Sequence, residues 1–246
     1  MHLYTSVDVI RLIDWAMSGK FDVVLFFTLG LNIFSIVANS TAQNSCSLPP
    51  KIKDDYDYDW TSRNHDWMNA ESRTDYLVLT LSWSPAYCGS LSDMNREETF
   101  QCNRKSSFDL IVHGLWPQTS DVSSVRDHPR NCHNEEQIPQ SIIKRFFCLM
   151  PDEDLMQSEW EKHGSCYFPS ATDYFHTIEY LFNRLNIPDI RSMGKTSYWK
   201  IKKAFLRLNS PRLFPSAIFV KMSRHGQLKE IRICYDLHYN FISCKQ

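Results

Sequence analysis

Eight cysteines constrain the fold of this 246-residue chain more than any other feature. An even number of cysteines in an exported protein predicts disulfide bonds, although spacing alone does not identify the pairs. No two cysteines form a Cys-x-x-Cys pair, which argues against a zinc site. We therefore expect a domain cross-linked by disulfides. The cysteines are Cys46, Cys88, Cys102, Cys132, Cys148, Cys166, Cys234 and Cys244.

An apolar segment at 23–38 precedes all of these cysteines. It is shorter than the roughly 20 apolar residues of a membrane-spanning helix. A lysine precedes it, and small residues up to Ala42 follow it, as signal peptidase requires. We predict a signal peptide over 1–42, with Met17 as an alternative start. A retained anchor is the alternative. We expect a secreted or periplasmic protein with no stable membrane association after cleavage.

The rest of the chain divides into a polar part, 43–74, and a more apolar part, 75–246. The polar part lacks hydrophobic periodicity and alternates acidic and tyrosine residues at 54–59, which predicts a loosely ordered leader. The formal net charge of the chain is −1. Proteins that hold nucleic acid through many phosphates are usually basic. The charge balance therefore disfavours an architectural nucleic-acid binder and permits an enzyme that holds a few nucleotides in a local cleft.

Residue patterns in 75–246 indicate strands at both ends of the domain and helices between them. Strand-forming residues occur at 76–83, 108–113, 217–222 and 228–234. We expect Gly114 to end the second strand, and the last two strands to form a hairpin that turns at 225–226. Helical spacing occurs at 138–150, 174–185 and 198–208. Strands at both ends around a helical middle predict an α+β fold.

The segment Ile-Val-His-Gly-Leu-Trp-Pro-Gln at 111–118 contains a first candidate functional histidine. His113 follows apolar strand residues, at a position that can project a side chain into a cleft. Trp116 offers a flat face for stacking a nucleic-acid base, worth about 1–3 kcal/mol. The alternative is a histidine satisfied by a backbone carbonyl, with Trp116 in the core. By itself this segment is weak support for a site.

The segment Ser-Glu-Trp-Glu-Lys-His-Gly-Ser-Cys at 158–166 contains the second. Glu159, Lys162 and His163 have the i, i+3, i+4 spacing that places side chains on one helix face. Contact between Glu and Lys keeps both ionised, and the Glu can orient the imidazole. The alternative is an exposed, salt-bridged helix face. The helix can begin at Ser158, which fits a capping box, or near Asp152.

Together the two segments resemble the motifs of the ribonuclease T2 family, HGLWP and HEWxKHGxC. The first motif matches in full at 113–117. The flanks at 79–88 and 231–236 are similar to the bacterial branch, and the resemblance covers roughly 75–244. The second motif matches at Glu159, Trp160, Lys162, His163, Gly164 and Cys166.

The resemblance implies a central antiparallel sheet flanked by helices and a metal-independent endoribonuclease. Such an enzyme cleaves single-stranded RNA by transphosphorylation, leaves 2′,3′-cyclic phosphate ends and needs no cofactor. His163 is then the general base, His113 the general acid, and Glu159 and Lys162 stabilise the transition state. The chemistry fits, because imidazole titrates near neutrality and lysine carries a fixed charge. The acid and base assignments can be exchanged.

By the same resemblance, the disulfides are Cys88–Cys102, Cys132–Cys166 and Cys234–Cys244. Cys46 and Cys148 are left over, and they either pair or remain free.

Two departures from the family pattern affect substrate binding. Ser158 stands where the family usually has a phosphate-binding histidine, so we expect weaker binding or slower turnover. Leu155 and Met156 replace aromatic residues that the family often has there, which leaves the second base pocket undefined. Trp116 and Gln118 are the candidates for contacting the first base.

Two other classes of function remain as alternatives. One is an RNA-binding or signalling protein that has lost catalysis, for which Ser158 is the only hint. The other is a metal-dependent hydrolase with His113 and His163 as ligands, which the lack of an HExxH motif disfavours. RNA is the expected partner, and we expect a monomer.

Overall fold

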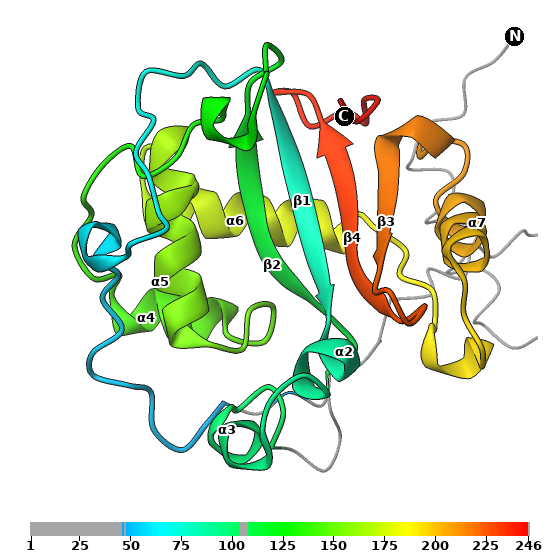
Figure 1. The fold of residues 1–246 in the computed structure, drawn as a ribbon, viewed down its shortest axis with the longest axis horizontal. Coiled ribbons are helices and arrows are strands. Elements are labelled where there is room, and N and C mark those ends of the chain that lie inside the picture. Colours follow the sequence, from blue (N-terminus) through cyan, green and yellow to red (C-terminus); the bar gives the residue numbers. More distant parts are fainter. Residues whose placement is uncertain (1–45, 47, 104–107, 246) are drawn as a thin grey trace, which may run out of the picture. The chain divides into compact units, whose positions relative to one another are not determined.

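A four-stranded antiparallel sheet, in the order β2-β1-β4-β3, forms the centre of the fold (Figure 1). The computed structural model describes residues 46, 48–103 and 108–245, so the expected signal peptide lies outside the described residues. β1 pairs with both β2 and β4, and β3 and β4 form the expected hairpin. The α+β prediction is confirmed. The strands are β1 (Tyr76–Trp83), β2 (Leu110–Gln118), β3 (Ile218–Met222) and β4 (Leu228–Tyr235).

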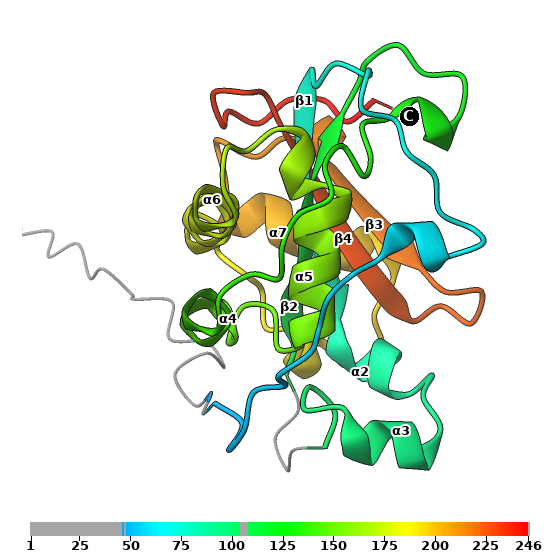
Figure 2. The ribbon, with the colours of Figure 1, turned by 90° about the vertical axis from the view of Figure 1, so that its left-hand side faces the viewer.

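Helices cover one face and the two sides of the sheet. α5 and α6 contact β2, and α7 contacts β3 at the opposite edge (Figures 1 and 2). None of the helices in the described part of the chain is long and apolar enough to cross a membrane. The helices are α2 (Ser84–Cys88), α3 (Asp93–Glu98), α4 (Gln140–Phe146), α5 (Glu153–Lys162), α6 (Ala171–Asn183) and α7 (Tyr198–Leu208). Short 3-10 helices are η2 (Trp60–Ser62), η3 (Val125–Asp127), η4 (Gly164–Cys166), η5 (Arg191–Met193) and η6 (Pro215–Ala217).

The expected helices differ from the observed ones mainly at their ends. The helix expected over 138–150 is shorter, because it begins only after Pro139 and ends at Phe146. α6 begins three residues earlier than expected, because the Ser170 side chain accepts a hydrogen bond from the Asp173 amide and caps it. α7 has the expected bounds.

The two faces of the sheet have different side chains. Leu77, Leu79 and Leu81 of β1 are fully buried and pack in the main core, as the two-residue period of a strand requires. The intervening residues face the other way. Pairing aligns Thr80 with Gly114 on one side and with Arg232 on the other, and Arg232 with Phe219. This second face forms the floor of the cavity described below.

β2 does not end at Gly114 as expected, because the strand continues to Gln118 through a β-bulge. Thr80 pairs with Gly114, whereas Leu81 pairs with Val112, so His113 is an extra residue in the strand. The bulge shifts the alternation by one position. Val112 can therefore be buried on the core side while His113 and Gly114 both lie on the opposite face.

The segment 48–74 packs along α5, on the side of the helix away from the sheet, and is not the loose leader that its composition suggested (Figures 1 and 2). Ile52 and Tyr56 are buried in the main core. The Tyr56 hydroxyl donates a 2.6 Å hydrogen bond to the carbonyl of Ile138. Apolar side chains placed singly among acidic residues escape a search for periodicity, yet a ready-made groove can bury each of them.

Four disulfides are present among the described residues. Three of them are the pairs that the family resemblance implies, and the fourth joins Cys46 to Cys148 across 102 residues. That fourth bond ties the start of the described segment to the end of the α4 region. Closing so long a loop lowers the entropy of the unfolded chain.

Candidate active site

A cavity of about 720 Å³ lies over the second face of the sheet, beside α5. Strand β2 and helix α5 bring their functional side chains to the same wall of this cavity. The structure thus joins two segments that are almost fifty positions apart in the chain. The predicted site residues that line the cavity are His113, Trp116, Gln118, Glu159, Lys162 and His163.

His113 occupies the strand side of the cavity, where the β-bulge directs its ring away from the core. Its Nε2 lies 3.6 Å from Oε1 of Glu159, and its Nδ1 lies 3.5 Å from Oγ of Ser82. Glu230 is also close, 3.9 Å from Nδ1. The side chain remains 30% exposed, so it can reach both solvent and a bound molecule.

Helix α5 presents the second group of side chains. It begins after Asp152, whose side chain accepts a hydrogen bond from the amide of Leu155, and so the alternative start at Ser158 is wrong. With this start, Glu159 and Lys162 lie in the last turn and His163 is the C-terminal cap. A histidine at this position is turned out of the regular helix.

Glu159 is the centre of the site. Its Oε1 lies 3.0 Å from the Lys162 ammonium, and its Oε2 accepts a 2.7 Å hydrogen bond from the Trp116 indole. His163 is 3.9 Å from the same oxygen. Burial alone raises the pKa of this carboxyl, but the charges of Lys162, His113 and His163 outweigh burial and lower the pKa to about 2. Glu159 is therefore a buried, ionised carboxylate between two imidazoles.

Gly114 makes this close approach possible. A Cβ atom on residue 114 would lie 2.3 Å from Oε2 of Glu159 and 2.9 Å from the Trp116 indole nitrogen. Both distances are too short for any side chain, so the carboxylate occupies the space that glycine leaves open. The glycine of the first histidine segment thus leaves space for the Glu159 carboxylate of the second segment.

His163 is more enclosed than His113, with 11% of its side chain exposed. Burial lowers its pKa to about 3, and the positive charges of Lys162 and Arg130 act in the same direction, although Glu159 opposes them. The ring is therefore neutral near neutral pH. A neutral imidazole has a free lone pair that can accept a proton.

Arg130 was not predicted from the sequence, but it lies beside His163 and is a second cation near the histidines, besides Lys162. One guanidinium nitrogen lies 3.4 Å from Nε2 of His163. Asp66 binds the guanidinium from the side, and the Trp67 ring stacks on it at 4.6 Å. The pKa of Asp66 is about 2, because the hydrogen bonds from Arg130 and Tyr58 outweigh its burial. Asp66 is therefore charged and fixes the arginine in place.

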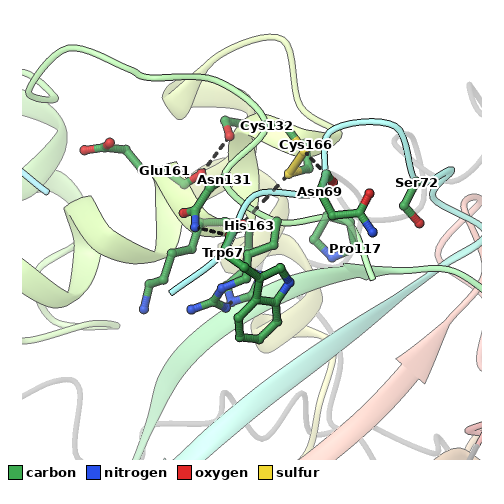
Figure 3. The surroundings of a disulfide bond; sticks show 12 residues. Trp67, Asn69, Ser72, Pro117, Asn131, Cys132, Glu161, His163 and Cys166 are labelled. Atoms are coloured by element: carbon green, nitrogen blue, oxygen red, sulfur yellow. Dashed lines mark hydrogen bonds between the residues drawn. A yellow bond between two sulfur atoms is a disulfide. The ribbon is translucent and has the colours of Figure 1, made fainter. Parts of the chain in front are cut away.

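The Cys132–Cys166 disulfide brings Arg130 to the site. Figure 3 shows the disulfide above His163, and Trp67 and Asn131 are also close to this histidine. The Asn131 amide donates to the carbonyl of Lys162, and its side chain donates to the carbonyl of Trp67. A signal for Arg130 was present in the sequence, since it stands two residues before Cys132, which the resemblance pairs with Cys166, three residues after His163.

Ser158 and Trp116, two of the expected substrate-binding residues, make contacts that the sequence did not predict. Ser158 does not line the cavity, and its hydroxyl donates to the carbonyl of Leu155 in its own helix. Trp116 is half-buried, holds Glu159 through its indole nitrogen, and has Arg232 over its ring at 5.0 Å. Trp116 therefore positions the Glu159 carboxylate and also presents an aromatic surface to the cavity.

Comparison with known proteins gives one consistent result. The model of the Ribonuclease T2 family matches residues 74–244, which contain both histidine segments. A probable ribonuclease of Haemophilus influenzae is 35% identical over 200 residues, which cover 76% of this chain and 68% of that protein. A ribonuclease of Aeromonas hydrophila is 36% identical over 104 residues, 42% of each chain.

Two solved structures are similar in fold. Trichomaglin, described as an S-like ribonuclease, superposes with a TM-score of 0.55 at 19% identity, covering 71% of this chain and 93% of its own. RNase NT, solved in complex with 5′-AMP, has a TM-score of 0.50 at 21% identity and covers 70% and 91%. At these identities the superpositions support the fold alone.

Proposed function

Since the chain belongs to the ribonuclease T2 family and is an endoribonuclease of that type, we propose that it cleaves single-stranded RNA without a metal ion and leaves a 2′,3′-cyclic phosphate. The observation that carries the proposal is the placement of His113 and His163 on either side of Glu159 in one cavity. Two imidazoles on opposite sides of a phosphate can exchange protons with both oxygens of an in-line displacement.

In the proposed reaction, neutral His163 removes the proton of the 2′-hydroxyl. The 2′-oxygen attacks the adjacent phosphorus, and the bond from phosphorus to the 5′-oxygen of the next nucleotide breaks. His113 donates a proton to that leaving oxygen. No atom is gained or lost in this step, because the proton taken at one histidine is matched by the proton given at the other. The low pKa of His163 keeps its ring neutral near neutral pH, which is the form that can accept the proton.

Charge at the phosphate develops during this displacement, and fixed cations stabilise it best. Lys162 is held by Glu159, and Arg130 by Asp66, so both cations are already in position before RNA binds. We assign Arg130 part of the phosphate contact that the family's usual histidine at position 158 supplies. A fixed, planar guanidinium is well suited to two phosphate oxygens.

Trp116 and Gln118 remain our candidates for contacts to the first base, since both line the cavity next to the histidines. The complex of RNase NT with 5′-AMP supports a nucleotide as occupant of such a cavity. Four disulfides and the apolar segment near the N-terminus support the further proposal that the protein is exported.

A defined single-stranded RNA with one cleavable linkage tests the chemistry. The oxidised protein is incubated in excess EDTA with an oligomer that is 2′-deoxy at all nucleotides except one, and the product ends are identified by mass. We expect cleavage only after the single ribonucleotide, with a cyclic phosphate end.

Two variants accompany this assay. His163→Ala should abolish cleavage, and His225→Ala, which changes an exposed histidine in the β3–β4 turn, should leave it unchanged. Loss of cleavage in EDTA that added metal restores would favour a metal-dependent hydrolase. Binding of RNA by folded protein without cleavage would favour a binding protein instead.

A further inference from the structure

The cavity that contains the two histidines extends across the sheet to α7. Besides β2 and α5, its walls include Tyr198 and Lys202 of α7, Phe219 of β3 and Lys245 near the C-terminus. Phe219 is separated from β2 by two intervening strands. With neighbouring strands about 4.8 Å apart, it lies roughly 14 Å from Gly114 across the sheet. Phe219 is therefore too far from the two histidines to contact the scissile phosphate.

The charge of the cavity differs from that of the whole chain. The chain has a formal net charge of −1. Among the described residues that line the cavity, five are Lys or Arg and only one is a carboxylate, Glu159. Arg130, Lys162 and Arg232 are each paired with a carboxylate, so Lys202 and Lys245 supply the positive charge that can attract a polyanion. The five cations are Arg130, Lys162, Lys202, Arg232 and Lys245.

Aromatic side chains line the same part of the cavity as Lys202. Phe219 lines the cavity and is 40% exposed, so its ring is accessible to a bound base. The Lys202 ammonium lies 3.0 Å from the Tyr198 hydroxyl and 5.3 Å from the centre of its ring. The sequence of α7 contains no Asp or Glu. Interleaved cations and aromatic rings are typical of surfaces that bind single-stranded nucleic acid.

From this arrangement we propose that Tyr198, Lys202, Phe219 and Lys245 form a second binding region for the same RNA chain. The region binds nucleotides beyond the two that flank the cleaved bond, by stacking bases on the rings and pairing phosphates with the lysines. It rests on the proposed endoribonuclease function, which it deepens by making a long single strand the favoured substrate. Solvated surface lysines are the ordinary alternative, and α7 itself supplies a control, because Lys203 is exposed and lies outside the cavity.

The test compares a dinucleotide with a twelve-nucleotide strand that contains a single ribonucleotide. For the long strand, Lys202→Glu and Phe219→Ala should each lower kcat/KM about tenfold, the size expected for losing one phosphate contact or one stacked base. Both variants should cleave the dinucleotide at the wild-type rate. Lys203→Glu, the same charge change on the same helix, should affect neither substrate.

The dependence on salt gives an independent measurement. Removing one phosphate contact to a single strand should reduce the slope of log kcat/KM against log salt by about 0.7 in Lys202→Ala, and Lys203→Ala should leave the slope unchanged. Equal effects of Lys202→Glu and Lys203→Glu on the long strand would overturn the proposal. So would equal loss of activity on both substrates, because the variant would then act on the catalytic centre.

Binding of an uncleavable, all-2′-deoxy twelve-nucleotide strand, followed by fluorescence anisotropy, separates this proposal from the catalytic one. If the wild type cleaves neither substrate but binds the strand more tightly than Lys202→Glu does, the second binding region stands and the proposed function fails. If the wild type cleaves the dinucleotide and both substitutions leave long-strand binding and cleavage unchanged, the function stands and the region fails.

Discussion

The site contains two His-Gly pairs, and the two glycines leave space for different neighbours. At His113-Gly114, on the bulged strand, the missing side chain makes room for the carboxylate of Glu159. At His163-Gly164, after α5, a Cβ would lie 2.4 Å from the Trp160 ring, in the core. One glycine thus leaves space for the carboxylate of Glu159, and the other leaves space for an aromatic ring. Identical dipeptides serve electrostatics in one place and packing in the other.

The two histidines also differ in their exposure and in the charges around them. His113 is more open to the cavity, whereas His163 is enclosed and faces Arg130 and Lys162. An enclosed ring beside cations stays neutral and can accept a proton. The His113 ring is accessible from the cavity, and its nitrogens lie 3.6 Å from Oε1 of Glu159 and 3.9 Å from Oε1 of Glu230. This difference in surroundings is why we propose His163 as the base and His113 as the acid.

The largest expected effects come from removing either histidine. His113→Ala and His163→Ala should each lower kcat about 10²- to 10⁴-fold, the range for a general acid or base. A substrate with a nitrophenolate leaving group sharpens the comparison, because that group leaves without being protonated. It should rescue His113→Ala and not His163→Ala. Rescue of His163→Ala alone would exchange the two roles.

The glycines should separate activity from stability. Gly164→Ala should lower the free energy of unfolding by about 1–3 kcal/mol, because the added methyl overpacks the core against Trp160. Gly114→Ala should instead lower kcat at least tenfold, because Glu159 is displaced from both histidines. Urea unfolding and initial rates measure the two effects. Equal losses of stability with no difference in kcat would contradict the distinction between the two pairs.

Arg130 contacts His163 and not His113, so its removal should change only one of the two rings. Arg130→Gln should raise the pKa of His163, because a positive charge beside the ring is lost. The acid limb of kcat/KM, where the base becomes protonated, should move to higher pH. The expected fall in kcat/KM is about tenfold. NMR titration of both histidines checks the assignment, and a shift confined to His113 would refute it.

A further expected effect concerns stability at acid pH. The folded pKa of His163 is about 3, below the ordinary value of 6.5, so between these values the unfolded chain binds more protons than the folded one. Stability therefore falls as the pH is lowered from about 6.5 towards 3. In His163→Asn this fall should be shallower, and in His225→Asn it should match the wild type. Urea midpoints at several pH values provide the measurement, and parallel curves for all three proteins would count against an enclosed, neutral His163.

Sequence patterns predicted much of the fold, and they failed where one contact depends on another. The bounds of β1 and α7 were predicted residue by residue, because each has an uninterrupted period and clear ends. The end of β2 was not, because a bulge leaves no mark in the hydrophobic pattern. Residues 48–74 were judged by their acidic composition, yet Ile52 and Tyr56 find burial in a groove that other segments build.

By itself, the sequence determined the chemical groups of the site and the order in which they occur. His113, Glu159, Lys162 and His163 stand in two short motifs, and local spacing places Glu159 and Lys162 in the last turn of one helix with His163 as its cap. Only the tertiary structure decided which group neighbours which, because electrostatic effects depend on distance and burial. It set Glu159 between both imidazoles and brought Arg130 to His163. Those two long-range contacts give the two histidines different surroundings, on which their proposed roles as acid and base depend.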